Sequence, residues 1–538
     1  MVGARCAAWA VGLGVLLGAG AARADFIDHF STPEDVGAAK VPRVGEPRIL
    51  VLTLQVDGFP EIDMDEVRAY FGATSEPGEA NFVDFYDRMS LGSFRPQVEV
   101  AEPLRLASCP LPEDYFGYED CAIPRGGGPT GADKTRSLEV GLALLQDLLR
   151  QADEELGVDF SRYDLSGPEG QPDGWVDGVL LLHNLNFGGI ALPLYALAAP
   201  QEAPSFDGVS VGIVGVAESP AVALHEFGHL LGWADLYDES GQTKGLPYSH
   251  MGSWDYDEPP LAVDAFSRWK AGWTQPTYVV REGETMTDLV LPPSADTGAM
   301  LQLGDGKEFF LVENRGNADG DYMDWGIRER GLAVYHVNLN RYPSPNAGQW
   351  LLRLVNCLNC DPWRPMLMSE QADGLFELQK PGFRRDDEGD LFRAGDMLVP
   401  SVENTAPLGA NNKVLSSNRS DGGVTGVYLT NLRQEGDDFV VDARVEVPCD
   451  LLACEAGCED GKCLPAPEPD PEPVEPEVEP EPDLGGDEDA DAGGAPSGAQ
   501  GGGGGGCATS PARAGWGGCG WLLVGLAWRW RRRRASLS

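Results

Sequence analysis

Apolar residues in the first half of the chain occur either as continuous runs or at helical spacing. The run at residues 49–56 predicts a strand that is buried on both faces of a sheet. Leucines at helical spacing between residues 133 and 156 predict a long helix that covers this sheet. The predicted elements are strands at 49–56, 94–100, 178–183 and 209–216 and helices at 81–89, 133–156 and 264–272. This alternation indicates an α/β or α+β domain.

After about residue 275 the pattern changes to short β-branched runs that are separated by Gly, Asn and Asp. Such runs are typical of strands joined by turns, so a β-rich domain is predicted beside the first domain. The expected strands are at 286–291, 309–313, 332–337, 424–429 and 439–447.

A further helix is predicted to begin after Ser219. The Ser219 hydroxyl can cap its first turn, and Pro220 suits the first helical position because that position needs no N–H donor. Apolar residues at 222, 224, 230 and 231 would hold the helix against a core. Gly232 can adopt a positive φ, so the helix is expected to end there and the chain to turn back.

This helix carries the pattern His-Glu-x-x-His. His225 and His229 are four residues apart and therefore lie on one face, where both imidazoles can reach one tetrahedral Zn²⁺. Glu226 lies beside them and is suited to take a proton from zinc-activated water rather than to bind the metal. Two core histidines on an amphipathic helix are the alternative interpretation. The residues that follow the pattern favour the zinc site.

Asp235 is the expected third zinc ligand, because the turn at Gly232 brings it back towards the histidines. Asp238 and Glu258 are the alternatives, and His250 is a weaker candidate because three ligands already complete the set. The fourth position would stay open for water, as a catalytic zinc requires, and no Cys lies nearby to close it.

Met251 follows in a turn at residues 248–255, shortly after the zinc-site helix. Ordinary core packing is the default interpretation of a lone methionine. Its place soon after the helix favours a methionine beneath the metal site.

The composition shows a strongly acidic chain. Of its 538 residues 85 are Asp or Glu and 40 are Lys or Arg, so the formal net charge is −45. This length allows a large catalytic domain, a second domain and tails. Nucleic acid is excluded as an expected partner, because phosphate binding needs a basic surface. Protein or peptide substrates are expected instead, and the sequence leaves the oligomeric state open.

Both ends of the chain predict export. Residues 1–24 combine Arg5, an apolar run and a small-residue cleavage site, which is typical of a secretory signal peptide. Residues 464–506 form a Pro/Glu-rich and then Gly-rich spacer. Cys507, an apolar stretch and the arginines at 531–534 follow, and they predict anchoring at the cell surface or outer membrane. Release into the medium is the alternative.

Cysteines are interpreted as disulfides because the chain is expected to be exported. Cys109 with Cys121, and Cys357 with Cys360, are two expected pairs. Four further cysteines within fifteen residues predict a small module with two disulfides in one of three pairings. They are Cys449, Cys454, Cys458 and Cys463.

Acidic clusters offer the oxygen ligands that Ca²⁺ prefers, so Ca²⁺ is a further candidate cofactor. One cluster comprises Asp319, Asp321 and Asp324, and the other comprises Asp235, Asp238 and Glu239. Neither matches the full EF-hand pattern, so solvated acidic turns are the default interpretation.

Nine segments resemble the immune inhibitor A family of secreted bacterial zinc metallopeptidases. They are residues 49–56, 85–94, 158–164, 173–177, 225–238, 250–254, 266–273, 310–315 and 331–337. The resemblance implies a zincin catalytic domain with metzincin-like features, a mixed sheet and an active-site helix. It implies that His225, His229 and Asp235 hold zinc and that Glu226 is the general base.

Two features depart from this family. His250 stands where a small or apolar residue is expected before the turn methionine, and no large pro-segment is evident before the first strand. The end of the chain resembles the MYXO-CTERM type of sorting signal. That second resemblance implies processing near Cys507 and surface attachment, and a plain single-span anchor is the alternative.

These patterns predict an exported zinc metalloendopeptidase that hydrolyses peptide bonds of extracellular proteins. The alternative is a catalytically inactive adhesin or binding module that retains the fold, and the presence of Glu226 favours the enzyme. The expected order is a signal peptide at 1–24, a catalytic domain at 25–274, a β-rich domain at 275–447, a disulfide-rich module at 448–463, a linker at 464–506 and a sorting or transmembrane segment at 507–538.

Overall fold

The computed structural model describes residues 41–464 except for 73–80, 109–130, 166–170, 186–188, 194–202, 237–245, 253–259, 317–322, 325, 328, 342–365, 380–387, 408, 410–413, 455 and 460. The predicted signal peptide, most of the spacer and the sorting segment lie outside these residues. The same holds for the following predicted disulfide and ligand residues: Cys109, Cys121, Cys357, Cys360, Asp238, Glu239, Glu258, Asp319 and Asp321. Within the described residues, no helix has both the length and the apolar character needed to cross a membrane.

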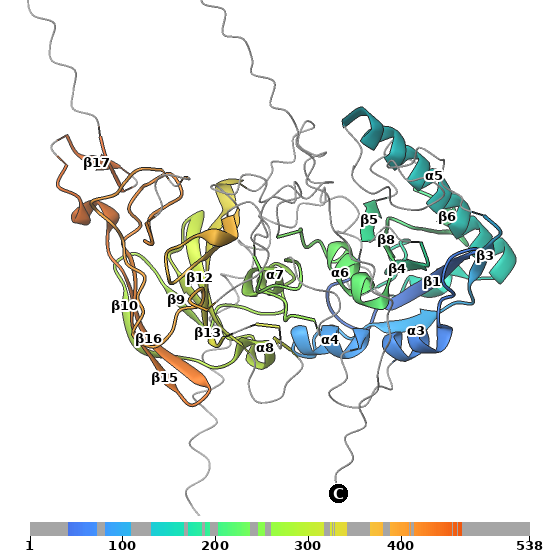
Figure 1. The fold of residues 1–538 in the computed structure, drawn as a ribbon, viewed down its shortest axis with the longest axis horizontal. Helices are drawn as coiled ribbons and strands as arrows, with labels where there is room; N and C mark the ends of the chain where they lie inside the picture. The colour runs from blue at the N-terminus through green and yellow to red at the C-terminus, as the bar shows by residue number, and fades with distance from the viewer. Residues whose placement is uncertain are drawn as a thin grey trace, which may run out of the picture. The chain divides into compact units, whose positions relative to one another are not determined.

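A six-stranded mixed sheet organises the first half of the described chain (Figure 1). Its strands follow the order β2-β1-β4-β8-β5, and β3 also pairs with β1. The strands are β1 (Arg48–Val56), β2 (Gln97–Val100), β3 (Leu104–Leu106), β4 (Val179–His183), β5 (Gly189–Pro193) and β8 (Ile213–Ala217). All of these pairs are parallel except β5 with β8. The mixed α/β organisation is therefore confirmed.

Helices cover both faces of this sheet (Figure 1). Side chains alternate along β1, so Ile49 and Val51 enter one core and Leu50 and Leu52 enter another. The predicted backing helix, α5 (Gly131–Leu156), supplies leucines to the second core. The helices in the first core are α3 (Met64–Phe71), α4 (Phe82–Met89), α6 (Pro220–Leu230) and α7 (Ala265–Lys270).

The predicted strand at 209–216 is wrong as a single element, because it consists of two strands. β7 (Val209–Ser210) pairs with β6 (Ser205–Phe206) in a hairpin, and β8 begins only at Ile213. Asp207 and Gly208 both have positive φ, and such a dipeptide closes a tight hairpin turn. The turn places Val209 in the hairpin, so the chain joins the main sheet only after the hairpin has ended.

The second half contains two antiparallel or mixed sheets that share a core. Their orders are β14-β13-β12-β11-β9 and β10-β16-β15. The strands are β9 (Tyr278–Val280), β10 (Thr285–Leu291), β11 (Leu301–Leu303), β12 (Glu308–Arg315), β13 (Gly331–Asn338), β14 (Leu367–Glu370), β15 (Val427–Glu435) and β16 (Asp438–Val445). A short helix, α8 (Ser294–Thr297), precedes β11.

Most of the predicted strands of this half are confirmed with small shifts, but the strand at 424–429 is displaced. β15 begins at Val427 and continues to Glu435, because its polar second half pairs with β16 beyond a register shift. Asn431 has a φ of 52° at that shift. The second half of β15 is mostly polar and has no regular alternation of apolar and polar residues, so the sequence pattern did not predict it as a strand.

The two halves also share buried apolar residues. Phe309 and Leu311 of β12 belong to the same core as α6, whereas Phe310 and Val312 face the three-stranded sheet. The Trp269 ring of α7 lies 5.6 Å from the Phe309 ring in an edge-to-face arrangement. β12 therefore packs against the layer of α6 and α7 on one face and against the β-rich part on the other.

A buried ionic network lies where these layers meet. Arg268 donates from Nη2 to Oε2 of Glu313 at 2.8 Å, and Arg315 donates from Nη1 to Oε1 of the same carboxylate at 3.0 Å. Arg315 also donates from Nε to Asp324 Oδ2 at 2.8 Å, and the Tyr335 hydroxyl donates to Glu313. These charged side chains are at most 3 % exposed.

The small cysteine module contains two disulfides, as predicted. Cys449 pairs with Cys458 and Cys454 pairs with Cys463, which selects one of the three possible pairings. The second members of both disulfides lie in the hairpin of β17 (Cys458–Glu459) and β18 (Lys462–Cys463). The carbonyl of Gly461 in this hairpin accepts a hydrogen bond from Val424 N at 3.0 Å, so the module joins the β-rich part.

Candidate metal centre

The helix α6 begins and ends as the sequence predicts. Ser219 Oγ accepts a hydrogen bond from Val222 N at 3.2 Å, which caps the first turn. Gly232 has a φ of 86°, and its N–H donates to His229 O at 2.9 Å. Lys270 of α7 donates to Gly232 O at 2.5 Å, which places a cation at the negative end of the helix.

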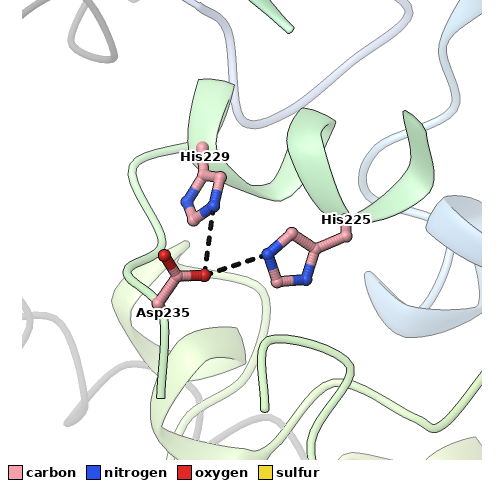
Figure 2. Close-up of side chains that lie close together, drawn as sticks. All are labelled: His225, His229 and Asp235. Carbon is pink, nitrogen blue, oxygen red and sulfur yellow. Dashed lines mark hydrogen bonds and ion pairs between the residues drawn. The ribbon is translucent and has the colours of Figure 1, made fainter. Parts of the chain in front are cut away.

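His225, His229 and Asp235 meet at one point (Figure 2). Asp235 Oδ1 lies 3.0 Å from His225 Nε2 and 3.3 Å from His229 Nε2. The two imidazole rings are 4.9 Å apart and nearly perpendicular. The three residues are only 1 %, 9 % and 8 % exposed, so they form a nearly enclosed group. The turn after Gly232 returns Asp235 to the helix, which is the geometry that the sequence suggested.

Backbone carbonyls fix the proton positions on both histidines. His225 Nδ1 is 3.1 Å from His250 O, and His229 Nδ1 is 2.8 Å from Trp233 O. A carbonyl oxygen can only accept, so each Nδ1 carries a proton. In the neutral imidazole the lone pair is therefore on Nε2, the atom that faces Asp235. This second contact is the usual way in which a protein orients a metal-binding histidine.

The lone pairs of two Nε2 atoms and a carboxylate oxygen repel one another unless a cation lies between them. Protonation of the imidazoles is one way to supply this positive charge. Burial lowers the pKa of His229, but the neighbouring Asp235 carboxylate outweighs burial and raises the pKa to about 9. Burial raises the pKa of Asp235, yet His229 and His225 hold it well below its usual range. Protonating both rings would bury two imidazolium charges side by side, which is costly. Zinc ligands about 2.1 Å from the metal lie roughly 3.4 Å apart in a tetrahedron, close to the separations of these atoms, so these residues fit zinc.

Glu226 occupies the same enclosed site but is not a member of the ligand group. It is 4 % exposed, and its Oε2 has no hydrogen-bond partner among the described residues. Burial raises the pKa of the Glu226 carboxyl to about 7, although His229 and His225 oppose this shift. A general base needs a carboxylate oxygen that is not committed to another protein group, and Glu226 Oε2 meets this condition among the described residues.

The loop that carries Asp235 is held by a chain of hydrogen bonds that sequence reasoning missed. Leu236 N donates to Met251 O at 2.9 Å, and Met251 N donates to Ser249 Oγ at 3.1 Å. Ser249 in turn donates to Asp264 Oδ2 at 2.5 Å, and Asp264 caps α7. The capping pattern before α7 was the only signal in the sequence for this role of Asp264.

Met251 lies directly against α6. It is fully buried, and a Cβ atom at Gly228 would be 2.5 Å from its Sδ and 2.8 Å from Trp233 Cε3. Only glycine fits at residue 228, between the two histidines, because a larger side chain would displace the methionine. Met251 therefore packs against the helix that carries both histidines, and a methionine beneath a metal site stays a prediction.

The His250 ring does not join the ligand group. It is fully buried, 4.8 Å from the Phe85 ring and 5.9 Å from the His225 ring. Burial and the neighbouring His225 hold the pKa of His250 well below its usual value. Its carbonyl, rather than its side chain, contacts the site through His225 Nδ1.

Asp324 is the one described member of the acidic cluster that also contains Asp319 and Asp321. Its carboxylate accepts hydrogen bonds from Arg315 and, at 3.1 Å, from Ala262 N. Asp324 therefore belongs to the buried ionic network, and calcium binding by this cluster stays a prediction.

A scan against protein-family models found no match to this chain, and a search of curated proteins found no similar protein. The likeness to the immune inhibitor A family stays a prediction. Function is therefore inferred from the chemistry of the site.

We expect Asp235→Ala to lower zinc affinity by more than about 100-fold. Loss of a residue that only contacts a metal ligand costs about 10–100-fold, and loss of a direct ligand should cost more. Zinc per chain after dialysis, measured by mass spectrometry of the metal, tests this. Glu66→Ala, on an exposed position of α3, makes the same charge change away from the site and should keep its zinc. Unchanged zinc in folded Asp235→Ala would move the third ligand to another carboxylate.

Proposed function

We propose that this protein is an exported zinc-dependent metalloendopeptidase that hydrolyses peptide bonds of extracellular proteins. One observation carries the proposal: two imidazole Nε2 atoms and a carboxylate oxygen converge while both Nδ1 atoms donate to carbonyls. Three protein ligands leave a tetrahedral zinc with one open position, which is the arrangement of catalytic zinc sites. Glu226, with a free buried oxygen beside them, supplies the base.

In this proposal the residues divide the work of hydrolysis. His225, His229 and Asp235 would hold zinc. A bound zinc ion would act as a Lewis acid, which lowers the pKa of water and polarises the substrate carbonyl. Glu226 takes one proton from the attacking water as the water oxygen bonds to the peptide carbonyl carbon. Glu226 then returns that proton to the leaving nitrogen as the C–N bond breaks. One water is consumed, and a carboxyl and an amine are released.

We further propose that the first half has the zincin fold of the metzincin type. Three features support this: a helix with both histidines that is followed by a turn at Gly232, Met251 against that helix, and an antiparallel strand at the end of an otherwise parallel sheet. β5 ends the strand order among the described strands, whereas β8 lies between two neighbours. A peptide substrate would therefore pair with β5, the strand at the edge of the sheet.

The proposed location is the cell surface or outer membrane, with the signal peptide and the sorting segment at the two ends of the chain. An exported location also suits the two disulfides of the cysteine module. Residues 1–40 and 465–538, which carry the targeting patterns, lie outside the described residues.

A casein or gelatin zymogram of the purified protein tests the proposed function. We expect a cleared band that disappears with a chelator and returns when zinc is added, because hydrolysis depends on the metal. A serine-protease inhibitor serves as the control and should leave the band intact. Zinc-loaded, folded protein that clears neither substrate would favour the alternative of an inactive adhesin or binding module.

A further inference from the structure

The helix α7 contacts two turns of the candidate metal centre, one from each of its ends. Its N-cap residue, Asp264, is fully buried, and its Oδ2 accepts a hydrogen bond from Ser249 Oγ at 2.5 Å. Its last residue, Lys270, donates to Gly232 O at 2.5 Å. Ser249 belongs to the turn at residues 247–252, and Gly232 belongs to the turn after α6. One short helix therefore contacts both turns.

The Ser249 side chain fixes the first of these turns internally. While its hydroxyl donates to Asp264, its Oγ accepts from Met251 N at 3.1 Å, and Ser249 O accepts from Gly252 N at 2.9 Å. A Cβ atom at Gly252 would lie 1.7 Å from Leu246 O, so only glycine fits there. The turn is therefore tightly packed, and the bond to Asp264 sets its position relative to α7.

This turn contacts the surroundings of two proposed zinc ligands. The His250 carbonyl accepts from His225 Nδ1 at 3.1 Å and so orients that imidazole. The Met251 carbonyl accepts at 2.9 Å from the N–H of Leu236, the residue after Asp235. A shift of the turn would therefore move the partner of one ligand and the backbone beside another.

The second turn orients the third proposed ligand. The Trp233 carbonyl accepts from His229 Nδ1 at 2.8 Å, and Trp233 N donates to Gly228 O at 3.0 Å. Trp233 directly follows Gly232, whose carbonyl accepts from Lys270. The Lys270 ammonium therefore holds the peptide unit next to the carbonyl that orients His229.

The position of α7 is itself set by β12. Ala265 N donates to Glu313 Oε1 at 3.2 Å, and Arg268 Nη2 donates to Glu313 Oε2 at 2.8 Å. The Glu313 carboxylate is fully buried. Because α7 is fixed on this side, its two ends can hold the turns in place.

We propose that Ser249, Asp264 and Lys270 are positioning residues of the metal centre. The inference rests on the proposed zinc site, and none of the three residues belongs to the ligand group. They act through the carbonyls of His250 and Trp233, which orient the two histidines, and through the backbone beside the carboxylate ligand. Loss of residues that orient metal ligands lowers metal affinity by about 10–100-fold.

Competition with a chromophoric chelator, with zinc and the full-length protein, tests this role. We expect Ser249→Ala to bind zinc about 10-fold more weakly, because its turn loses the bond to α7. Lys270→Met keeps the length of the side chain but removes the donor to Gly232, and a similar loss is expected. The visible absorption of bound Co²⁺, which depends on ligand geometry, should differ from that of the wild type in both variants.

Asp264→Asn separates positioning from helix capping. Asn caps helices about as well as Asp, so α7 should keep its first turn. The amide nitrogen would then face Ser249, and the serine hydroxyl cannot donate to it. We expect weaker zinc binding and an altered Co²⁺ spectrum in this variant as well.

Ser417→Ala is the matched control. Ser417 is fully buried in the β-rich part, and its hydroxyl donates to Val427 O at 2.6 Å. This variant loses a buried hydroxyl, as Ser249→Ala does, but should keep the wild-type zinc affinity and Co²⁺ spectrum even if its melting temperature falls. An equal loss of zinc affinity in Ser417→Ala would show that metal binding follows stability alone and would overturn the inference.

Wild-type affinity and spectra in folded Ser249→Ala, Asp264→Asn and Lys270→Met would overturn the inference and leave the proposed zinc site intact. A wild type that binds neither zinc nor Co²⁺ would overturn the proposed function and this inference together. If the variants at the two buried residues do not fold, Lys270→Met decides the question, because Lys270 is only partly buried.

Discussion

Glu226→Gln should lose proteolysis by several orders of magnitude while it keeps its zinc and its fold. The amide has nearly the shape of the carboxylate, so the helix and both imidazoles are undisturbed. It cannot accept a proton from water, and acid–base catalysis alone typically contributes about 10²–10⁴-fold to the rate. The remaining loss comes from the absence of a negative charge beside the developing positive charge on the attacking water. Hydrolysis of a fluorogenic peptide library, with zinc content measured on the same sample, gives the result.

The matched control is Glu218→Gln, which makes the same chemical change at an exposed residue just before α6. This variant should retain the wild-type rate. Undiminished turnover by Glu226→Gln would remove Glu226 from the mechanism even if zinc remained necessary. Loss of both zinc and activity would instead show that Glu226 holds the metal, which the ligand group of His225, His229 and Asp235 does not predict.

Arg315→Leu should lower the free energy of unfolding by about 3–5 kcal/mol, because it breaks a buried ion pair from one side. Arg315 is 1 % exposed and donates to Glu313 and Asp324 together. Coulombic attraction to Asp324 and Glu313 outweighs burial and raises the pKa of the guanidinium further. Leucine would leave Asp324 with no side-chain cation among its described contacts, and a buried carboxylate without one is costly. Urea unfolding followed by circular dichroism measures the change.

Arg433→Leu is the control for this prediction. Arg433 pairs with Asp288 and Glu435, but its side chain is 34 % exposed, and exposed ion pairs contribute about 0–1 kcal/mol. Equal stability losses in the two variants would contradict the view that burial makes the Arg315 network important. A loss confined to Arg315→Leu would support it.

The same network reaches the candidate metal centre by two backbone contacts. Asp324 accepts from Ala262 N at 3.1 Å, and Ala262 O accepts from His250 N at 3.3 Å. The His250 carbonyl then accepts from His225 Nδ1. The β-rich part therefore helps to position a proposed zinc ligand.

The sequence by itself determined the local features of the site. His225 and His229 share a face because the helical repeat places residues four apart on one side. Ser219 and Gly232 set the ends of that helix through capping and a positive φ, which depend only on neighbouring residues. The buried strand at 49–56 and the two disulfides of the cysteine module followed from patterns of the same short range. Each of these features is confirmed.

Only the tertiary structure decided which distant residues meet. The His250 carbonyl, the Ser249 to Asp264 hydrogen bond and the contact of Met251 with Gly228 join segments that are separate in the sequence. Composition and periodicity indicate the secondary structure and the buried face of each segment. Contacts between segments depend on how sheets and helices pack, and that packing is fixed by the whole core at once.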